Sequence, residues 1–372
     1  MVVLTKINHC VIISSALNGL LCTNISLKLP GGHNMKFLRK KIAIYSFSLI
    51  TLGLGSISTS YASTLRLTHF FKADSDAGKA ASEFAQKVEE QSDGRIEIKV
   101  YPSSQLGDWV ETHTLIMQGA IDIGLQPLST NFDPRLAIAW FPYIAPTYEA
   151  AEKAYNKDGF AYKTVQKIIE PQNLQLLGVF ADGMGGAGFT KAIQNPSNPN
   201  EKRDTRIRVW PGGTTHQVLM QKLGYQVATL PWAELYTGMQ TGVIDGQIGG
   251  SPELANSNFK DINKFWIQYN DHLELAWFVM NSSKLQSLPA QDQKIIRDVA
   301  NSISTNRFKT VKDSDSKQLD IMRENGTTVV TFTDEELANL VEFTRTQVWP
   351  LIGKELGDDV MKDIKIGLGI KD

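Results

Sequence analysis

Cysteine is almost absent from this sequence of 372 residues. Its two cysteines, Cys10 and Cys22, both precede residue 63, and the 310 residues from that position onward have none. This larger part of the chain therefore has no thiol for a disulfide, a cysteine metal site or thiol-dependent catalysis.

Motifs of catalysis and metal binding are missing as well. The histidines form no H-x-x-x-H or H-E-x-x-H pair, and no G-x-S-x-G sequence occurs. Most carboxylates fall in helix patterns, where a solvated face is the ordinary explanation, and no nucleophile lies in a recognisable pattern with a base. We expect no cofactor, no metal site and no enzymatic activity.

One apolar run stands out, and it follows a basic segment that begins at Met35. MKFLRKK precedes an apolar stretch from Ile42 to about Leu54, and Ser60-Tyr61-Ala62 has the small-x-small pattern of a cleavage site. These features predict an export signal cleaved after Ala62, translation starting at Met35 rather than at residue 1, and a periplasmic protein. A membrane anchor is the alternative, but the run is shorter than the ~20 residues that span a bilayer.

The charge of the mature chain is negative. Residues 1–62 contain six basic and no acidic residues, which leaves 32 basic against 39 acidic residues and a net charge of −7. An acidic protein is a poor partner for nucleic acid. The overall composition, 42% hydrophobic and 21% charged, is that of a globular protein long enough for two domains.

Hydrophobic periodicity predicts two sets of strands and helices. The first set has strands at 65–70, 95–102 and 120–128 with helices near 78–93 and 109–118, an order that implies a parallel sheet. The second set has strands at 174–181, 206–210, 225–230, 243–250 and 273–281, with helices at 214–224 and 231–242. From Pro289 a helical pattern continues to Asn325, long enough to brace two lobes. A strand at 327–332 and a helix opened by a Thr333–Glu336 capping box close the chain.

The stretch DGMGGAGFTK, 182–191, has the G-x-G-x-x-G spacing of a dinucleotide-binding loop. That function needs a helix after the third glycine and an acidic residue about 20 positions further on. Pro196 and Pro199 leave too little room for the helix, and the next strand ends in Arg208-Val209-Trp210. We therefore interpret the stretch as a bend where the chain enters a second lobe.

Aromatic and cationic residues gather where the predicted strands end, and in open α/β sheets ligands bind outside these ends. The candidates are Phe70, Phe71, Trp109, Gln126, Arg208, Trp210 and Trp232. Aromatic walls with one arginine suit a small organic anion, because arginine pairs with a carboxylate through two hydrogen bonds and stays charged.

Several stretches together resemble the substrate-binding proteins of tripartite ATP-independent periplasmic (TRAP) transporters, of the DctP type. They are FAQKVEEQSDGRIEIKVYPSSQLGD, QGAIDIG, RIRVW and LGYQVATLPWAELYTGMQTGVIDGQ, and the resemblance extends over 63–372. It implies an α/β fold of two lobes with a ligand cleft between them and a long C-terminal helix spanning both. Lobe I would comprise 63–182 with about 273–284, lobe II 183–272, and residues 285–372 would brace both.

The resemblance also implies roles for individual residues. The arginine that clamps the ligand carboxylate falls on Arg208, and a ligand-contacting aromatic falls on Trp232; Phe70 and Trp109 lie near two further contact positions. Where many relatives have an asparagine, this chain has Gly249, and near Gly188 many have a second arginine. Both changes remove polar contacts, which favours an apolar or aromatic monocarboxylate over a sugar acid; a small keto or hydroxy acid remains an alternative.

The expected partners are this organic acid and the small and large membrane subunits of a TRAP transporter, with a monomeric receptor. Two other functions stay open at this point. One is a binding protein that serves a sensor, and the other is a periplasmic enzyme on the same fold.

Overall fold

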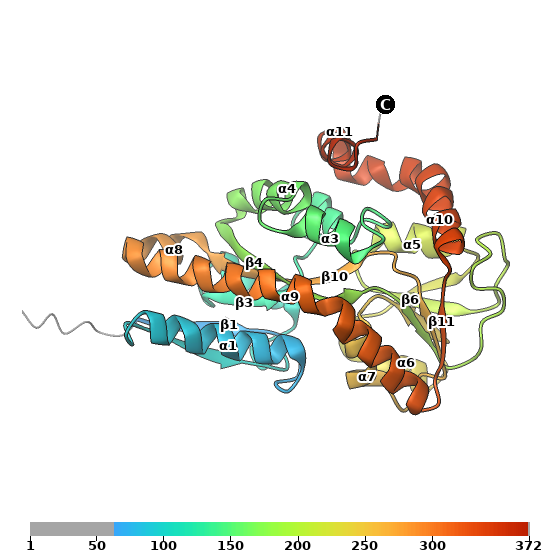
Figure 1. The fold of residues 1–372 in the computed structure, drawn as a ribbon, viewed down its shortest axis with the longest axis horizontal. Helices are drawn as coiled ribbons and strands as arrows, with labels where there is room; N and C mark the ends of the chain where they lie inside the picture. The colour runs from blue at the N-terminus through green and yellow to red at the C-terminus, as the bar shows by residue number, and fades with distance from the viewer. Residues whose placement is uncertain (1–62, 371–372) are drawn as a thin grey trace, which may run out of the picture. The chain divides into compact units, whose positions relative to one another are not determined.

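The computed structural model describes residues 63–370, which belong to one compact unit, Thr59–Asp372. Its strands form two separate sheets, with helices packed on both (Figure 1). The predicted export signal lies outside the described residues. Within 63–370 no helix is both long enough and apolar enough to cross a bilayer.

The first sheet has five strands in the order β2-β1-β3-β10-β4. They are β1 (Ser63–Thr68), β2 (Ile96–Tyr101), β3 (Ile123–Gln126), β4 (Leu174–Met184) and β10 (Leu273–Asn281). The strands β1, β2 and β3 run parallel, as their alternation with helices predicted, and β10 runs antiparallel to both β3 and β4. The chain therefore returns to this sheet at β10, after β5 (Ala187–Phe189) to β9 (Phe265–Gln268) have formed part of the second sheet.

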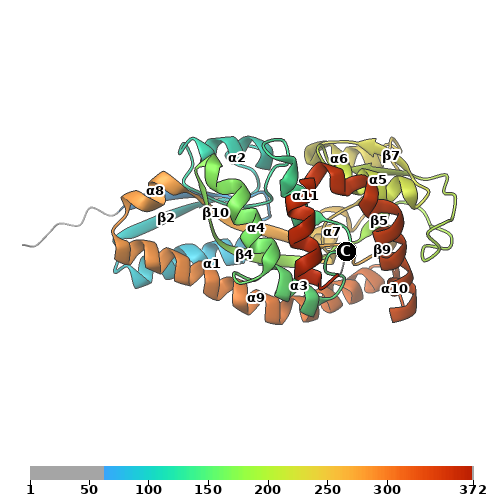
Figure 2. The ribbon, with the colours of Figure 1, turned by 90° about the horizontal axis from the view of Figure 1, so that it is seen from above.

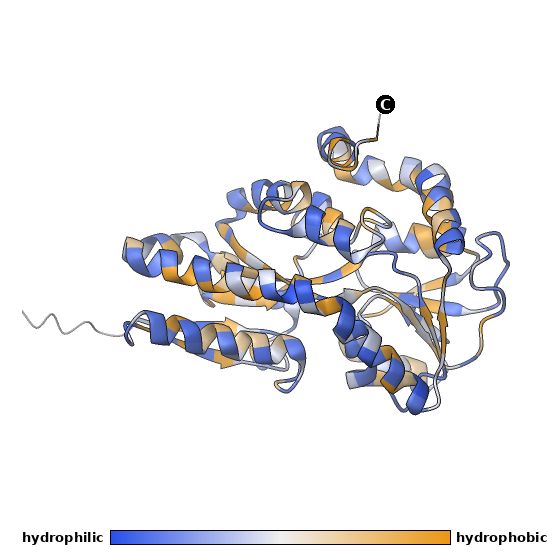
Figure 3. Cartoon of the chain, in the orientation of Figure 1, coloured by the Kyte–Doolittle hydropathy of each residue, from blue (hydrophilic) through white to orange (hydrophobic). Residues whose placement is uncertain are grey.

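Both faces of the first sheet are buried, because successive side chains of a strand point to opposite sides. On β10, Phe278 and Met280 pack in an apolar cluster with residues of α1 (Asp76–Gln91) and α9 (Ala290–Glu324). The alternate residues Trp277 and Val279 pack in another cluster, with residues of α2 (Trp109–Met117) and α4 (Phe160–Ile169). Hydrophilic residues predominate on the outer faces of α1 and α9 (Figure 3).

The second sheet has six strands in the order β11-β9-β5-β8-β6-β7. They are β5 (Ala187–Phe189), β6 (Arg206–Val209), β7 (Gln226–Thr229), β8 (Gly246–Ile248), β9 (Phe265–Gln268) and β11 (Thr328–Thr331). The strand β6 is parallel to β7 and β8, whereas β5 is antiparallel to β8 and β9. The helices α5 (Thr214–Lys222), α6 (Trp232–Gln240) and α7 (Pro252–Phe259) belong to this part of the chain.

The glycine stretch is the point where the chain passes from one sheet to the other. The strand β4 runs on to Met184, Gly185 and Gly186 follow, and β5 begins at once in the second sheet. A Cβ atom would lie 2.3 Å from His272 at Gly185 and 2.4 Å from Trp266 at Gly186. Close packing therefore requires glycine here, and a strand follows where a dinucleotide-binding loop needs a helix.

The helix α9 is continuous over 35 residues, as predicted, and contacts β4 and α1 in one part and α7 and β11 in another (Figure 2). It spans both sheets. Beyond β11, α10 (Asp334–Phe343) opens with the predicted capping box, since Thr333 accepts a hydrogen bond from Glu336 and the Glu336 side chain bonds back.

Six further helical elements complete residues 63–370. They are η1 (Pro134–Trp140), α3 (Tyr148–Tyr155), η2 (Glu170–Gln172), α8 (Ser282–Ser287), η3 (Thr344–Val348) and α11 (Trp349–Leu368). The proposed lobe boundaries stay a prediction. β11 comes from the predicted bracing segment 285–372, yet it is a strand of the second sheet.

Candidate functional site

A cavity of about 60 Å³ gathers residues from the ends of strands in both sheets. Six of the predicted site residues line it: Phe70, Trp109, Arg208, Trp210, Trp232 and Gly249. Five further lining residues were not among those predicted: Pro127, Trp140, Gly250, Leu254 and Glu274. At about 10–15 Å³ for each water, the space holds roughly four to six water-sized groups, which suits a small ligand.

Arg208 owes its position to the alternation of side chains along β6. Its neighbours Ile207 and Val209 face an apolar cluster, so Arg208 points to the opposite side, where it is buried and lines the cavity. Its Nε donates to the Leu230 carbonyl oxygen at 2.9 Å, which fixes the guanidinium. Burial lowers the pKa of Arg208 to about 10, partly offset by Glu274, so the side chain is a cation at neutral pH.

The terminal nitrogens of Arg208 are available for a ligand. Within residues 63–370 no carboxylate forms an ion pair with this guanidinium, and its only hydrogen bond is the one from Nε. Glu274 compensates only part of the desolvation of Arg208, and among residues 63–370 no acceptor bonds to its terminal nitrogens. The two terminal nitrogens of Arg208 can therefore donate hydrogen bonds to an acceptor such as a carboxylate.

Aromatic rings form most of the remaining wall. Trp140 lies between Trp109 and Trp210, with ring centroids 6.4 and 5.6 Å away, and Phe70 meets Trp232 edge-on at 6.1 Å. These rings come from the first residues of α2 and α6, from the end of η1 and from segments just after β1 and β6. Five separate segments of the chain therefore build one aromatic enclosure.

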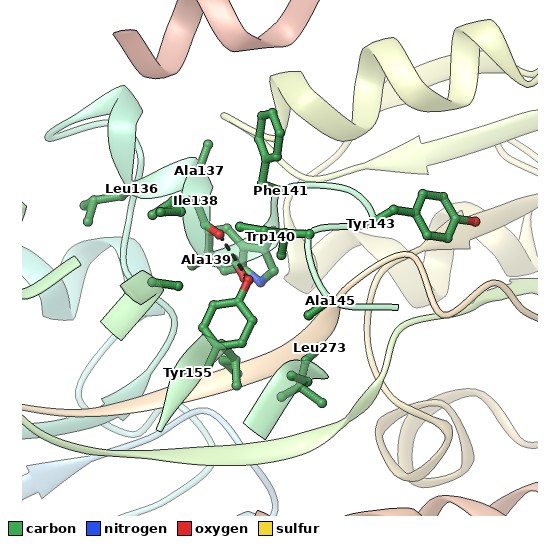
Figure 4. Close-up of a cluster of buried hydrophobic side chains, with 14 of the residues drawn as sticks. Leu136, Ala137, Ile138, Ala139, Trp140, Phe141, Tyr143, Ala145, Tyr155 and Leu273 are labelled. Carbon is green, nitrogen blue, oxygen red and sulfur yellow. Dashed lines mark hydrogen bonds between the residues drawn. The ribbon is translucent and has the colours of Figure 1, made fainter. Parts of the chain in front are cut away.

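The sequence does not reveal Trp140, because no strand end or motif marks it. It ends η1, a segment packed inside the protein, and Figure 4 shows it among buried side chains. The Tyr155 hydroxyl donates to the carbonyl oxygens of Ile138 at 3.2 Å and Ala139 at 3.4 Å, which holds the backbone just before the ring. Trp140 is thus a rigid part of the wall.

Three predicted residues do not line the cavity. Phe71 is buried and stacks on Phe70 with ring centroids 4.1 Å apart, so it supports a lining residue from behind. Gln126 is also buried; its amide nitrogen donates to the Trp109 carbonyl oxygen at 3.0 Å, and its amide oxygen accepts from Thr112. Gln126 therefore holds the start of α2.

Gly188 is the third residue away from the cavity. It lies in the middle of β5, between β8 and β9, and a Cβ atom there would be 2.7 Å from Oδ1 of Asn263. The space that a side chain would take is thus filled by Asn263. The missing side chain at position 188 therefore does not enlarge the cavity.

Glu274 is the second charged residue of the cavity wall. Its Oε2 accepts a hydrogen bond from the Gly250 backbone N–H at 3.2 Å and lies 3.1 Å from Nε2 of His272. Its other oxygen, Oε1, has no hydrogen-bond partner among residues 63–370. A charged residue inside the apolar strand LELAWFVMN was the available sequence signal, the same one that singled out Arg208 in RIRVW.

Behind Glu274, buried polar groups form a chain that sequence spacing did not reveal. Oδ2 of Asp271 lies 2.8 Å from Nδ1 of His272 and 2.8 Å from Nε2 of His216. Burial alone would lower the pKa of His272, but Asp271 and Glu274 raise it to about 10. His272 is therefore an imidazolium that donates to a carboxylate on either side.

The pKa values of the other two members are both lowered, which leaves Asp271 charged and His216 neutral. Burial favours the neutral acid for Asp271, but the two histidines hold its pKa well below the usual range. Burial lowers the pKa of His216, so this ring is neutral at pH 7. Ligand atoms of His216, Asp271 and His272 lie within 4.8 Å of one another, as in a metal site, but a metal ion would have to replace the hydrogen bonds and the proton of His272.

Residues 67–350 match the family described as bacterial extracellular solute-binding protein, family 7 (DctP). Among curated relatives, the 2,3-diketo-L-gulonate-binding periplasmic protein of Escherichia coli is 23% identical over 88% of this chain and 96% of its own. The C4-dicarboxylate-binding periplasmic protein of Rhodobacter capsulatus is 24% identical over 87% and 96%. The sialic acid-binding periplasmic protein of Vibrio cholerae is 21% identical over 80% and 91%.

Solved structures show the same fold. A TRAP periplasmic solute-binding protein of Desulfovibrio salexigens with bound orotic acid has a TM-score of 0.73, with 20% identity over 82% of this chain and 98% of its own. One from Ralstonia eutropha with bound (S)-2-acetolactate also has a TM-score of 0.73, with 20% identity over 84% and 100%. The expected two-lobe fold is confirmed, and the chain belongs to family 7 of the bacterial extracellular solute-binding proteins, the DctP family.

Proposed function

We propose that this protein captures a small organic acid in the periplasm and delivers it to the membrane subunits of a TRAP transporter. The observation that carries the proposal is Arg208, a buried cation that lines the cavity and has no ion-pair partner among residues 63–370. A ligand carboxylate would accept two hydrogen bonds from its terminal nitrogens, and the low dielectric of the cavity would strengthen the pair.

The lining favours a ligand with a compact, apolar or aromatic body. Four tryptophans and Phe70 surround the cavity, and the two glycines at 249 and 250 offer no side-chain hydrogen bond. The curated relatives bind a diketo sugar acid, a C4-dicarboxylate and sialic acid. Because few polar side chains line this cavity, we expect a monocarboxylate, and a small keto or hydroxy acid is the alternative within the same class.

Capture would occur by closure of the two lobes around the ligand. Contacts already join the parts of the chain around the two sheets. Between loops, Thr130 Oγ1 donates to the Gly212 carbonyl oxygen at 3.0 Å, and between the first turns of α1 and α7 the Asp76 N–H donates to Glu253 at 2.8 Å. Closing on a bound acid would exclude water from the cavity and complete its aromatic wall. The receptor would act as a monomer without a cofactor, and it would bind rather than transform its ligand.

The direct test is a thermal-shift screen of purified 63–372 against organic acids, with mass spectrometry of any ligand retained through purification. The proposal predicts a stabilising carboxylate that is recovered chemically unchanged. Stabilisation by no acid, with retention of a compound that lacks a carboxylate, would contradict it, and turnover of the bound compound would establish an enzyme instead. Reconstitution with the two membrane subunits would separate transport from sensing.

A further inference from the structure

The cavity presents a carboxylate as well as a guanidinium, and the carboxylate is partly free. The Glu274 side chain is 12% exposed, and only its Oε2 is used by Gly250 and His272. Oε1 is therefore left as an acceptor in a wall where Arg208 is the only other charged side chain. A ligand that fills this space must face both an anion and a cation.

The charges around the cavity already cancel. Arg208 and His272 each carry one positive charge, whereas Glu274 and Asp271 each carry one negative charge, and His216 is neutral. A simple monocarboxylate would add an uncompensated negative charge to this buried group, close to Glu274. An uncompensated buried charge is strongly unfavourable, whereas a ligand with no net charge leaves the balance intact.

The aromatic wall suits a positive group. Cζ of Arg208 lies 6.0 Å from the ring centroid of Trp232, so a cation already covers one face of this ring. Trp140 and Trp210, whose ring centroids are 5.6 Å apart, line the same cavity as Glu274 and have no cation over their rings among residues 63–370. Indole faces attract ammonium groups, and a set of rings beside a carboxylate is a recognised way to hold a methylated or ring-borne cation.

We propose that the ligand is a compact zwitterion, with its carboxylate on Arg208 and an ammonium-type cation between Glu274 and the rings of Trp140 and Trp210. This inference rests on the proposed function and narrows it. It makes Glu274 the residue that selects among small acids. A carbon-bodied acid of the same shape would leave Oε1 of Glu274 without a donor.

The test compares pairs of probes that differ only in the cation. Trimethylglycine is matched with 3,3-dimethylbutanoate, proline with cyclopentanecarboxylate, and phenylalanine with 2-methyl-3-phenylpropanoate, each titrated by calorimetry into ligand-free 63–372. We expect the tightest-binding compound to be a zwitterion, with its carbon isostere at least about 10-fold weaker. A carbon-bodied acid as the tightest binder would overturn this inference and keep the proposed function; binding of choline but of no carboxylate would overturn both.

Variants identify the residue responsible. Glu274→Gln should weaken the best zwitterion about 10- to 100-fold while its carbon isostere binds as well as before or better, and exposed Glu335→Gln is the matched control. Because Glu274 also pairs with His272, Trp140→Leu is a second variant that leaves this pair intact. Loss of the ring should weaken the zwitterion about 2- to 30-fold and its isostere less. Equal losses for both members of a pair would overturn the proposed role.

Discussion

Gly249 lies directly against the indole ring of Trp210. A Cβ atom at position 249 would come within 3.0 Å of Cζ3 of Trp210, and the φ angle of Gly249 is +100°. The ring thus takes the place that a side chain would need. The loss of an asparagine at this position, inferred from the resemblance, is therefore accompanied by an aromatic wall rather than by an enlarged cavity.

Gly249→Ala should weaken ligand binding by about 10-fold or more, because the new methyl group pushes Trp210 into the cavity. Stability should fall by about 1–3 kcal/mol from the strained backbone. Gly242→Ala is the matched control, since Gly242 also has a positive φ, +74°, but nothing within 4 Å of its Cβ position. Calorimetry and thermal unfolding would separate the two effects, and unchanged affinity in Gly249→Ala would refute the contact.

Arg208→Ala should reduce affinity for the ligand on the order of 100-fold or more, since removing one partner of a buried charge pair costs about 2–5 kcal/mol. Arg206→Ala is the control on the same strand. Arg206 is exposed and bonds to the Val243 carbonyl oxygen, outside the cavity lining. Titration of both variants with the ligand found by screening would show whether Arg208 is the clamp, and wild-type affinity in Arg208→Ala would exclude it.

Gly188→Ala should destabilise the protein by about 1–3 kcal/mol without changing which ligands bind, because the added methyl group meets Asn263 rather than the cavity. Denaturant unfolding gives the first quantity, and the probe panel gives the second. A change in ligand preference at unaltered stability would restore Gly188 to the site.

His272 should make stability fall as the pH rises. Its pKa is about 10 in the folded protein and about 6.5 in an unfolded chain, so its contribution is complete below pH 6.5 and is lost between pH 6.5 and 10. His272→Gln should lower stability at pH 7 by about 3–5 kcal/mol, as expected when a buried ion pair is broken. It should also remove most of the decline from pH 7 to 10.

His113→Gln is the control for that slope. Burial lowers the pKa of His113 to about 4, so it is neutral throughout the alkaline range and should leave the decline unchanged. Unfolding by denaturant at several pH values would give the comparison. The same alkaline slope in wild type and His272→Gln would show that His272 is not the group that titrates.

Strong periodicity made much of the fold predictable. The helix from Ala290 to Glu324 and the strand from Leu273 to Asn281 have long, regular apolar patterns and were expected with nearly these limits. The strands β5 and β9 were not expected: β5 lies in the glycine stretch that was interpreted as a bend, and the four residues of β9 are all buried, so they show no alternation. Their hydrogen bonds come from strands distant in sequence, so pairing rather than propensity defines them.

The site was predictable where a charged residue lies among apolar and aromatic residues in the sequence. Arg208 was recognised as the one cation among aromatic residues at predicted strand ends, whereas Glu274, the one charged residue of LELAWFVMN, was overlooked. The position of Trp140 between Trp109 and Trp210, and the pairing of His216 with Asp271, depend on tertiary packing between segments distant in sequence. Such contacts between distant segments leave no pattern in the local sequence.

The strand β11 has a consequence for how a shortened chain would behave. It is the outermost strand of the second sheet, it pairs with β9, and it follows α9 near the end of the sequence. A chain that stops before Thr328 would therefore leave the edge of β9 open, with unpaired N–H and C=O groups that invite other strands. The last part of the polypeptide thus moves the edge of the sheet from β9, whose residues are all buried, to β11, whose two threonines are exposed.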